Sequence, residues 1–275
     1  MKHYPCILTI AGSDCSGGAG IQADIKTISA LGAYAASAVT AITVQNTRGV
    51  TGIHPVPPAC VKAQIEAVMA DIRPRAVKIG MVNDAGTIRA IAESLEAYPS
   101  HYTVLDPVMI STSGHRLMEE DAITALTGRL MPLATLITPN LHEAEALTGK
   151  KISTLSEMEA AARELLAFGS QAVLVKGGHL EEEEMCDVLY IKGETQPRLF
   201  SSPKIESRNT HGTGCTLSSA IATYLALGEP LGEAVRKAKA YVHQGISTGK
   251  DVHIGAGHGP LNHFFAPVAM KTIGG

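Results

Sequence analysis

The chain has 275 residues, of which 45% are hydrophobic and 18% charged, and its formal net charge is −3. This composition allows one large domain with a substantial core and excludes an intrinsically disordered chain. Lysine and arginine are not clustered, so we expect no nucleic-acid partner, and local groups must hold any phosphorylated ligand. Five cysteines, no signal-peptide pattern and no long apolar run predict a cytoplasmic protein with reduced thiols and no membrane association.

Short apolar runs alternate with helical patterns along the chain. The apolar runs predict strands at 6–11, 39–44, 76–79, 103–107, 135–138 and 172–176. The patterns that separate and follow them predict helices at 19–31, 57–70, 84–98, 119–130, 141–148, 156–168, 214–227 and 231–247. This alternation predicts an α/β fold with a mostly parallel sheet and helices on both faces. Residues 185–208 predict an antiparallel edge hairpin, and no linker or repeat divides 1–275, so we expect a single domain.

The first glycine-rich junction, AGSDCSGGAG at residues 11–20, follows a predicted strand and opens a predicted helix. It matches neither the Walker A pattern nor GxGxxG. Small residues there let a ligand approach the backbone closely and expose amide groups at the helix start. Asp24 lies one helical turn after Gly20 and is expected to reach back towards the strand ends. The alternative interpretation is a tight turn with no ligand.

The second junction, NTHGTGCT at residues 209–216, opens the 214–227 helix. Gly212 and Gly214 free the backbone to turn, so that successive N–H groups can converge on one anion with the helix dipole behind them. Thr210 and Thr213 add hydroxyl donors. Phosphoryl transfer depends mainly on positioning and on electrostatic stabilisation, which such a loop supplies. A capped helix start with small residues for packing is the alternative.

Ligands of open parallel sheets bind beyond the carboxyl ends of the strands, so residues at those ends, chiefly the polar ones, are candidates. The candidates are Gln45, Met81, Asp106, Asn140, Glu143 and Lys176. Oxygen-bearing side chains near a phosphate site suit a hydrated magnesium ion, and a single lysine suits a phosphate as a point charge. Taken singly, each residue is better explained by a structural role, such as capping a turn, and only their joint occurrence favours a functional site.

Seven motifs occur in an order and spacing that identify a family: AGSDCSGGAGIQADIKTISALGAY, TAITVQNT, VKIGM, DPVM, TPNLHEAEALTG, VLVKGG and NTHGTGCTLSSAIA. Over residues 6–249 the chain closely resembles bacterial hydroxymethylpyrimidine/phosphomethylpyrimidine kinases of thiamin biosynthesis. The resemblance implies a ribokinase-like three-layer α/β/α sandwich, a homodimer, and ATP with Mg²⁺ as phosphoryl donor. It also implies two successive phosphorylations, first of the pyrimidine hydroxymethyl group and then of the phosphate just made.

The resemblance also implies roles for individual residues. Gln45 would read the pyrimidine ring by hydrogen bonding, and the remaining substrate contacts would come from Ala19, Gly20, Asp24, Met81 and Val108. Asp106, Asn140 and Glu143 would order the metal and its waters, with Asn140 also near the nucleotide. Lys176 would contact phosphate. The anion-binding loop would comprise Thr210, Gly212, Thr213, Gly214 and Cys215.

Cys215 stands where the wider superfamily usually has the aspartate of a GTGD motif, which acts as the catalytic base. A thiol has a pKa of about 8.5, and a helix N-terminus lowers it. We therefore expect Cys215 to accept the acceptor's proton as a thiolate, the alternative being a small residue with only a structural role. Residues 110–115 (ISTSGH) resemble the family's mobile flap, which we expect to close over substrate.

Two competing functions stay open on sequence alone. A kinase of the same fold that acts on pyridoxal is the nearer one, and Gln45 and Met81 discriminate only weakly against it. A non-catalytic pyrimidine-binding sensor is the more remote one. Such a sensor has no need of Lys176, Asn140, Glu143 and the 210–215 loop, all of which this chain retains.

Overall fold

The computed structural model describes residues 2–109, 118, 120–178 and 184–274. Within them the chain forms a nine-stranded sheet in the order β3-β2-β1-β4-β5-β6-β7-β8-β9. The strands are β1 Cys6–Asp14, β2 Tyr34–Asn46, β3 Gly49–Pro55, β4 Ala76–Ile79, β5 Tyr102–Leu105, β6 Leu136–Ile137, β7 Ala172–Val175, β8 Glu184–Ile191 and β9 Arg198–Pro203. The helices are α1 Gly20–Ala30, α2 Pro58–Asp71, α3 Ala85–Ala97, α4 Glu120–Ala125, α5 Leu141–Thr148, α6 Leu155–Leu165, α7 Thr213–Ala226 and α8 Leu231–Gly249.

The central strands run parallel, and both edges of the sheet are antiparallel. Strands β2, β1, β4, β5, β6 and β7 pair in parallel, whereas β3 pairs antiparallel with β2, and β8 and β9 extend the opposite edge antiparallel. From β1 the chain moves first outward to β2 and then back across to β4 on the other side. The strand order therefore reverses between β1 and β4, where a doubly wound sheet opens a crevice for ligands.

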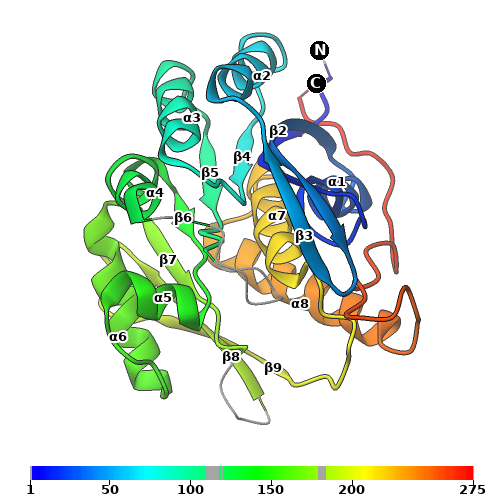
Figure 1. The fold of residues 1–275 in the computed structure, drawn as a ribbon. Coiled ribbons are helices and arrows are strands. Elements are labelled where there is room, and N and C mark those ends of the chain that lie inside the picture. The colour runs from blue at the N-terminus through cyan, green and yellow to red at the C-terminus, as the bar shows by residue number, and fades with distance from the viewer. Residues whose placement is uncertain (1, 110–117, 119, 179–183, 275) are drawn as a thin grey trace.

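Helices cover both faces of the sheet (Figure 1). Because side chains alternate along a strand, Leu8 and Ile10 of β1 join one core while Ile7 joins the other. The first core packs the sheet against α2, α3, α4 and α6, and the second packs it against α1, α7 and α8. This arrangement confirms the predicted three-layer α/β/α sandwich.

The main differences from the predicted elements are an additional strand and an interrupted helix. Strand β3 was not predicted, because its sequence GVTGIHP has two glycines and no apolar alternation, and it forms by pairing with the edge of β2. The predicted 119–130 helix is α4 followed by a wider π turn at Leu126–Leu130. A 3-10 turn at Met131–Leu133 then follows, where Pro132 lacks the N–H that an α-helix needs. The predicted 185–208 hairpin is confirmed as β8 and β9.

The described helices include none that combines the length and the apolar character needed to cross a membrane.

Candidate active site

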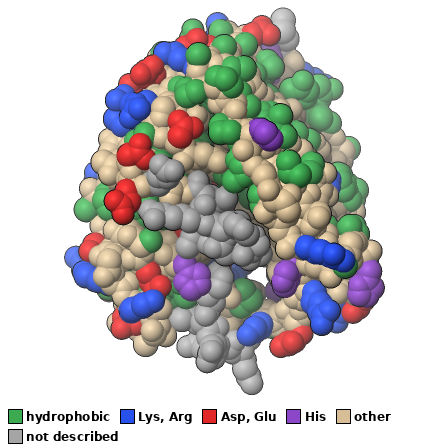
Figure 2. Space-filling view, in the orientation of Figure 1, with side chains coloured by type: hydrophobic (Ala, Val, Ile, Leu, Met, Phe, Trp, Pro, Cys, Tyr) green, Lys and Arg blue, Asp and Glu red, His purple; other side chains and the backbone are tan. Residues whose placement is uncertain are grey.

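A cavity of about 650 Å³ opens at the carboxyl ends of the parallel strands. The face seen in Figure 2 is hollowed below its centre, where lysine, arginine and histidine side chains gather. Every site residue predicted from the sequence lines this cavity except Asp24. The two halves of the predicted site, the Gln45 end and the 210–215 loop, therefore face one common space.

The start of α7 forms one wall of the cavity. Its N-cap, Gly212, has φ of 82°, and a Cβ there would lie 1.9 Å from the backbone oxygen of Gly18, so only glycine fits. The first amides of an α-helix have no acceptor within the helix. Since Gly214 and Cys215 line the cavity, their N–H groups and the positive end of the helix dipole offer a site for an anion.

Lys176 and Asp106 form an ion pair beside this helix start. Lys176 Nζ donates to Asp106 Oδ1 at 2.7 Å, and Thr138 Oγ1 donates to the same oxygen at 3.0 Å. A Cβ at Gly214 would lie 3.5 Å from Lys176 Nζ and 3.4 Å from Asp106 Oδ2. The ammonium group and the α7 amides can therefore contact the same phosphoryl group.

Lys176 stays charged in this setting. Burial acts to lower its pKa, but the carboxylates of Asp106 and Glu143 outweigh burial, so the pKa is raised above its ordinary value. Its side chain is 14% exposed, which leaves the ammonium within reach of a ligand.

Asn140 and Glu143 form a capping box at the start of α5. Asn140 Oδ1 accepts from the Glu143 amide at 2.9 Å, and Glu143 Oε2 accepts from the Asn140 amide at 2.8 Å. Burial raises the pKa of Glu143 to about 7, an effect that the Lys176 charge opposes and the Asp106 charge reinforces. The buried carboxyl is therefore held at the cavity wall by a local structural motif.

The donor set suits a magnesium ion that is held mainly through water. The cavity presents oxygen donors from Asp106, Asn140 and Glu143, but the capping box already engages one oxygen of each α5 side chain. In the described part of the chain no group of three His, Cys, Asp or Glu side chains could itself enclose a metal. Mg²⁺ commonly keeps several waters and takes phosphate oxygens, so few protein ligands suffice.

Asp24 does not reach the substrate cavity, and that prediction was wrong. Its side chain is 0% exposed and pairs with Lys78 Nζ at 2.8 Å. It also accepts from Thr9 Oγ1 at 2.5 Å and from Ser219 Oγ at 2.6 Å. The carboxylate turns into the α1–α7 interface because three donors from β1, β4 and α7 satisfy it there, and so it ties these elements together.

The environment of Cys215 opposes the expected thiolate. Desolvation raises the pKa of this thiol to about 11, although the nearby Lys78 charge and a backbone hydrogen bond from Gly20 favour the thiolate. The sequence had suggested a lowered pKa from the helix N-terminus alone. At neutral pH the resting form of Cys215 is therefore the thiol.

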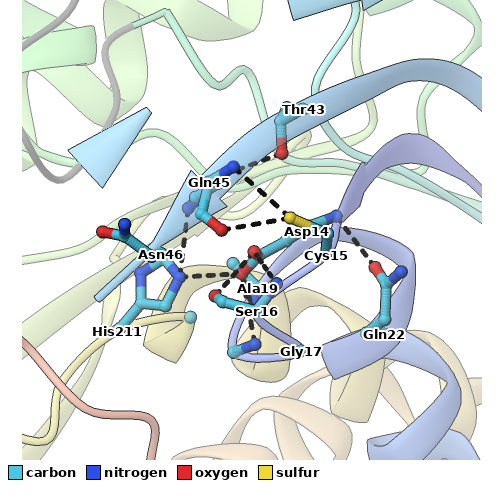
Figure 3. A network of polar contacts seen from close by, with 12 residues as sticks. Asp14, Cys15, Ser16, Gly17, Ala19, Gln22, Thr43, Gln45, Asn46 and His211 are labelled. Atoms are coloured by element: carbon cyan, nitrogen blue, oxygen red, sulfur yellow. Dashed lines mark hydrogen bonds and ion pairs between the residues drawn. The ribbon is translucent and has the colours of Figure 1, made fainter. Parts of the chain in front are cut away.

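The first glycine-rich junction satisfies its own amides. Asp14 Oδ1 accepts from Ser16 N and Oγ at 2.8 and 2.7 Å, and Asp14 Oδ2 accepts from Gly18 N and Ala19 N at 3.1 and 2.9 Å (Figure 3). Asp14 thus occupies the place that the sequence had suggested for a bound ligand. Ala19 and Gly20 still line the cavity.

Gln45 projects from β2 with residues that the sequence did not single out. Its side-chain amide lies 3.2 Å from His211 Nε2 and 3.0 Å from Thr43 Oγ1 (Figure 3). Met81 and Val108 line the cavity, as predicted. His211 lies inside the NTHGTGCT motif, but nothing in the sequence indicated that it contacts Gln45, because these residues are 166 positions apart.

Helix α8 also contributes to the cavity wall, through Lys239, Val242, His243 and Ile246. The sequence predicts the 231–247 helix but did not single out these four residues. The predicted flap at residues 110–115 lies outside the described residues.

Comparison with known proteins identifies the family. The family model described as phosphomethylpyrimidine kinase matches residues 14–262. The chain belongs to this family. It is 53% identical to the hydroxymethylpyrimidine/phosphomethylpyrimidine kinase of Rhizobium meliloti over 94% of this chain and 96% of the relative. It is also 52% identical to a thiamine biosynthesis bifunctional protein of Geobacter sulfurreducens, of whose length it spans only 52%, while 94% of this chain is covered.

Solved structures give the same assignment and show a second branch. The phosphomethylpyrimidine kinase of Clostridium difficile superposes with a TM-score of 0.78 at 48% identity, covering 88% of this chain and 99% of that one. An ADP complex of Bacillus subtilis pyridoxal kinase superposes with a TM-score of 0.86 at 35% identity, covering 95% and 98%. The fold is shared by both branches, whereas sequence identity is higher with the pyrimidine kinases.

Proposed function

We propose that this protein transfers the γ-phosphoryl group of ATP to 4-amino-5-hydroxymethyl-2-methylpyrimidine and then to the resulting monophosphate, in thiamin biosynthesis. One observation carries the proposal: the α7 amides and the Lys176–Asp106 pair face the same cavity as Gln45. A phosphoryl donor and a small ring can therefore meet in one enclosure. The 53% and 48% identities to pyrimidine kinases support this acceptor.

In this mechanism the phosphoryl group passes in front of the α7 N-terminus. Negative charge builds on its peripheral oxygens during transfer, and fixed donors stabilise that charge without reorganising. Lys176 and the amides of Gly214 and Cys215 supply those donors, while Asp106 holds the ammonium in place. In the second step the acceptor is already anionic, so it needs no base but depends on the same donors.

Cys215 is proposed as the base of the first step. With a pKa of about 11, the thiolate is rarely populated at neutral pH but is strongly basic when it forms. The first step is therefore expected to accelerate as pH rises. Thr210 and Thr213 are proposed to assist with hydroxyl donors at the nucleotide phosphates.

Mg²⁺ is proposed to bind with the nucleotide near Asp106, Asn140 and Glu143, where it would neutralise phosphate charge.

The proposal also includes a cytoplasmic location, consistent with the cysteines all being free. A homodimer is proposed as well, consistent with the exposed apolar side chains of Ile42 and Val44 on β2, which are 53% and 49% exposed.

Pyridoxal remains the second candidate acceptor because pyridoxal kinases share the fold at TM-scores near 0.86. The deciding experiment measures ADP release with each acceptor, and kcat/KM for the aminopyrimidine should exceed that for pyridoxal. A higher value for pyridoxal would reassign the acceptor. Nucleotide-independent pyrimidine binding without ADP release would indicate a sensor instead.

A further inference from the structure

One imidazole nitrogen is approached from two sides at the Gln45 end of the cavity (Figure 3). His211 Nε2 lies 2.9 Å from Asp14 Oδ2 and 3.2 Å from the side-chain amide of Gln45. The His211 and Asp14 side chains are only 10% and 3% exposed. A ring nitrogen carries either a hydrogen or a lone pair, so the two contacts constrain each other.

The Asp14 contact requires a hydrogen on His211 Nε2. Asp14 accepts hydrogen bonds from Ser16, Gly18 and Ala19, all of which favour the ionised carboxylate. Burial acts to raise the pKa of Asp14, but the hydrogen bonds from His211, Ser16 and Ala19 prevail and lower it far below its usual range. An ionised carboxylate only accepts, so Nε2 must be the donor.

Thr43 constrains the other end of the Gln45 amide. The Thr43 hydroxyl lies 2.9 Å from the Ser13 carbonyl oxygen and 3.0 Å from the Gln45 amide. A carbonyl can only accept, so both contacts are hydrogen bonds only when the single hydroxyl hydrogen goes to Ser13. The Thr43 oxygen is then left to accept a hydrogen from the NH₂ end of Gln45.

Both constraints give the same orientation of the Gln45 amide. Its oxygen must face His211 Nε2, whose single hydrogen is then shared between Asp14 at 2.9 Å and Gln45 at 3.2 Å, and its nitrogen must face Thr43. This is the reverse of the orientation drawn in Figure 3. In the drawn orientation two N–H donors would oppose each other across 3.2 Å. Amide oxygen and nitrogen have the same shape, so the reversal moves no heavy atom and only the hydrogen bonds decide between the two.

We propose that His211, held by Asp14, is a positioning residue that fixes the amide of Gln45 and thereby selects the ligand. The amide's remaining lone pair lies on the His211 side and its remaining N–H on the Thr43 side. A fitting ligand presents an amino donor next to a ring-nitrogen acceptor, as a 4-aminopyrimidine does. Pyridoxal has no amino group beside its ring nitrogen. The ligand's identity rests on the proposed function, whereas the amide orientation does not.

The orientation is tested first without ligand. In the ¹⁵N-labelled full-length protein, long-range ¹H–¹⁵N correlation should show a hydrogen on Nε2 of His211. An imidazole with hydrogen on Nδ1 and a bare Nε2 would overturn the proposal. This result stands or falls independently of whether the protein phosphorylates a pyrimidine.

Ligand selection is tested by calorimetric Kd values without nucleotide, for the aminopyrimidine and for pyridoxal. His211→Phe should weaken aminopyrimidine binding about tenfold, because the amide loses its orienting donor, and should change pyridoxal binding less. His211→Gln, which can restore an N–H donor, should recover part of the affinity. Equal losses for both ligands would overturn the selection role. Failure of the wild-type protein to bind the aminopyrimidine would instead refute the proposed function.

Ser16→Ala is the matched control, because it removes one hydrogen bond to Asp14 without touching Gln45. It should leave both Kd values unchanged, and a tenfold loss here would trace the effect to a general disturbance of the loop.

If His211→Phe does not fold, Thr43→Val tests the same orientation from the other side. It removes the acceptor of the Gln45 N–H and should weaken aminopyrimidine binding severalfold, and unchanged binding would contradict the proposal.

Discussion

Two Lys–Asp pairs, Lys78–Asp24 and Lys176–Asp106, use the same chemistry in different settings. The side chains of the first pair are both 0% exposed, and Asp24 also accepts from Thr9 and Ser219. In the second pair Lys176 is 14% exposed and adjoins the start of α7. A sealed pair must be satisfied internally, whereas a pair at a cavity wall can offer a charge to a ligand. Access to the cavity thus separates a structural from a functional role for one residue type.

The largest expected effect comes from breaking the sealed pair. Lys78→Met leaves the Asp24 carboxylate uncompensated in the core, which costs about 3–5 kcal/mol of unfolding free energy. Urea denaturation measures the loss. The double variant Lys78→Met/Asp24→Leu removes both charges and should recover most of the stability. A double variant as unstable as the single one would show that the lost packing, not the unpaired charge, dominates.

Breaking the cavity pair should act on catalysis instead. Lys176→Met removes a fixed cation from the transferring phosphoryl group and should lower kcat/KM about 10²- to 10³-fold in both steps. Its loss of unfolding free energy should be smaller than that of Lys78→Met, because Asp106 lines the cavity, where solvent can compensate its charge, whereas Asp24 is sealed in the core. Steady-state kinetics and denaturation on the same samples separate the two effects. Unchanged kcat/KM would remove Lys176 from the mechanism.

The role of Cys215 can be tested through the pH dependence of kcat in the two phosphorylation steps. If its thiolate, with a pKa of about 11, is the base, kcat of the first step should rise close to tenfold per pH unit between pH 7 and 9. In Cys215→Ser this rise should disappear, and the second step should be nearly flat in both proteins. A first step that is flat with pH in the wild type would exclude the base role.

The same thiol makes folding sensitive to alkaline pH. The folded pKa of about 11 lies above the reference value of 9.0, so the folded protein binds this proton more tightly. The stability contribution is complete below about pH 9 and is lost as pH rises towards 11. Denaturation midpoints of wild type and Cys215→Ala should therefore diverge only above pH 9. Parallel curves up to pH 11 would place the thiol in a more solvated setting.

The smallest effects distinguish two capping boxes. Thr154 and Glu157 cap α6 at the surface in the way that Asn140 and Glu143 cap α5 at the cavity. Thr154→Ala should cost about 1 kcal/mol of stability and leave kinetics unchanged. Asn140→Ala should cost a similar amount and also raise the KM for MgATP. Identical kinetics for the two variants would make the α5 box purely structural.

Local rules accounted for much of the fold. Apolar runs located the buried strands, because a strand covered on both faces needs few polar residues. Gly32 and Gly169, with φ of 80° and 97°, follow their helices as C-terminal stops. The edge strand β3 was not predicted from the sequence, because this half-exposed segment becomes a strand only through pairing with β2. Helix α6 begins at Leu155, one residue before the predicted start at 156, because Thr154 caps it.

The site divides in the same way. Strand-end and glycine-loop residues were predictable, since parallel topology brings strand ends together. Asp24 was assigned to the substrate by the family resemblance, and its position one turn after Gly20 predicted only that it reaches back towards the strand ends. The direction of its side chain depends on Lys78 and Ser219, which are far away in sequence. The high pKa of Cys215 was likewise hidden, because helix position is local whereas desolvation depends on everything packed around the thiol.

The sequence by itself determined the family, the alternating α/β order and the residue types at the strand ends, since these follow from short-range pattern and motif spacing. Only the tertiary structure decided which charges are sealed and which face the cavity, that Asp14 occupies the first glycine loop, and that His211 meets Gln45. Burial and hydrogen-bond partnership are properties of segments brought together from distant parts of the chain. No local pattern encodes them.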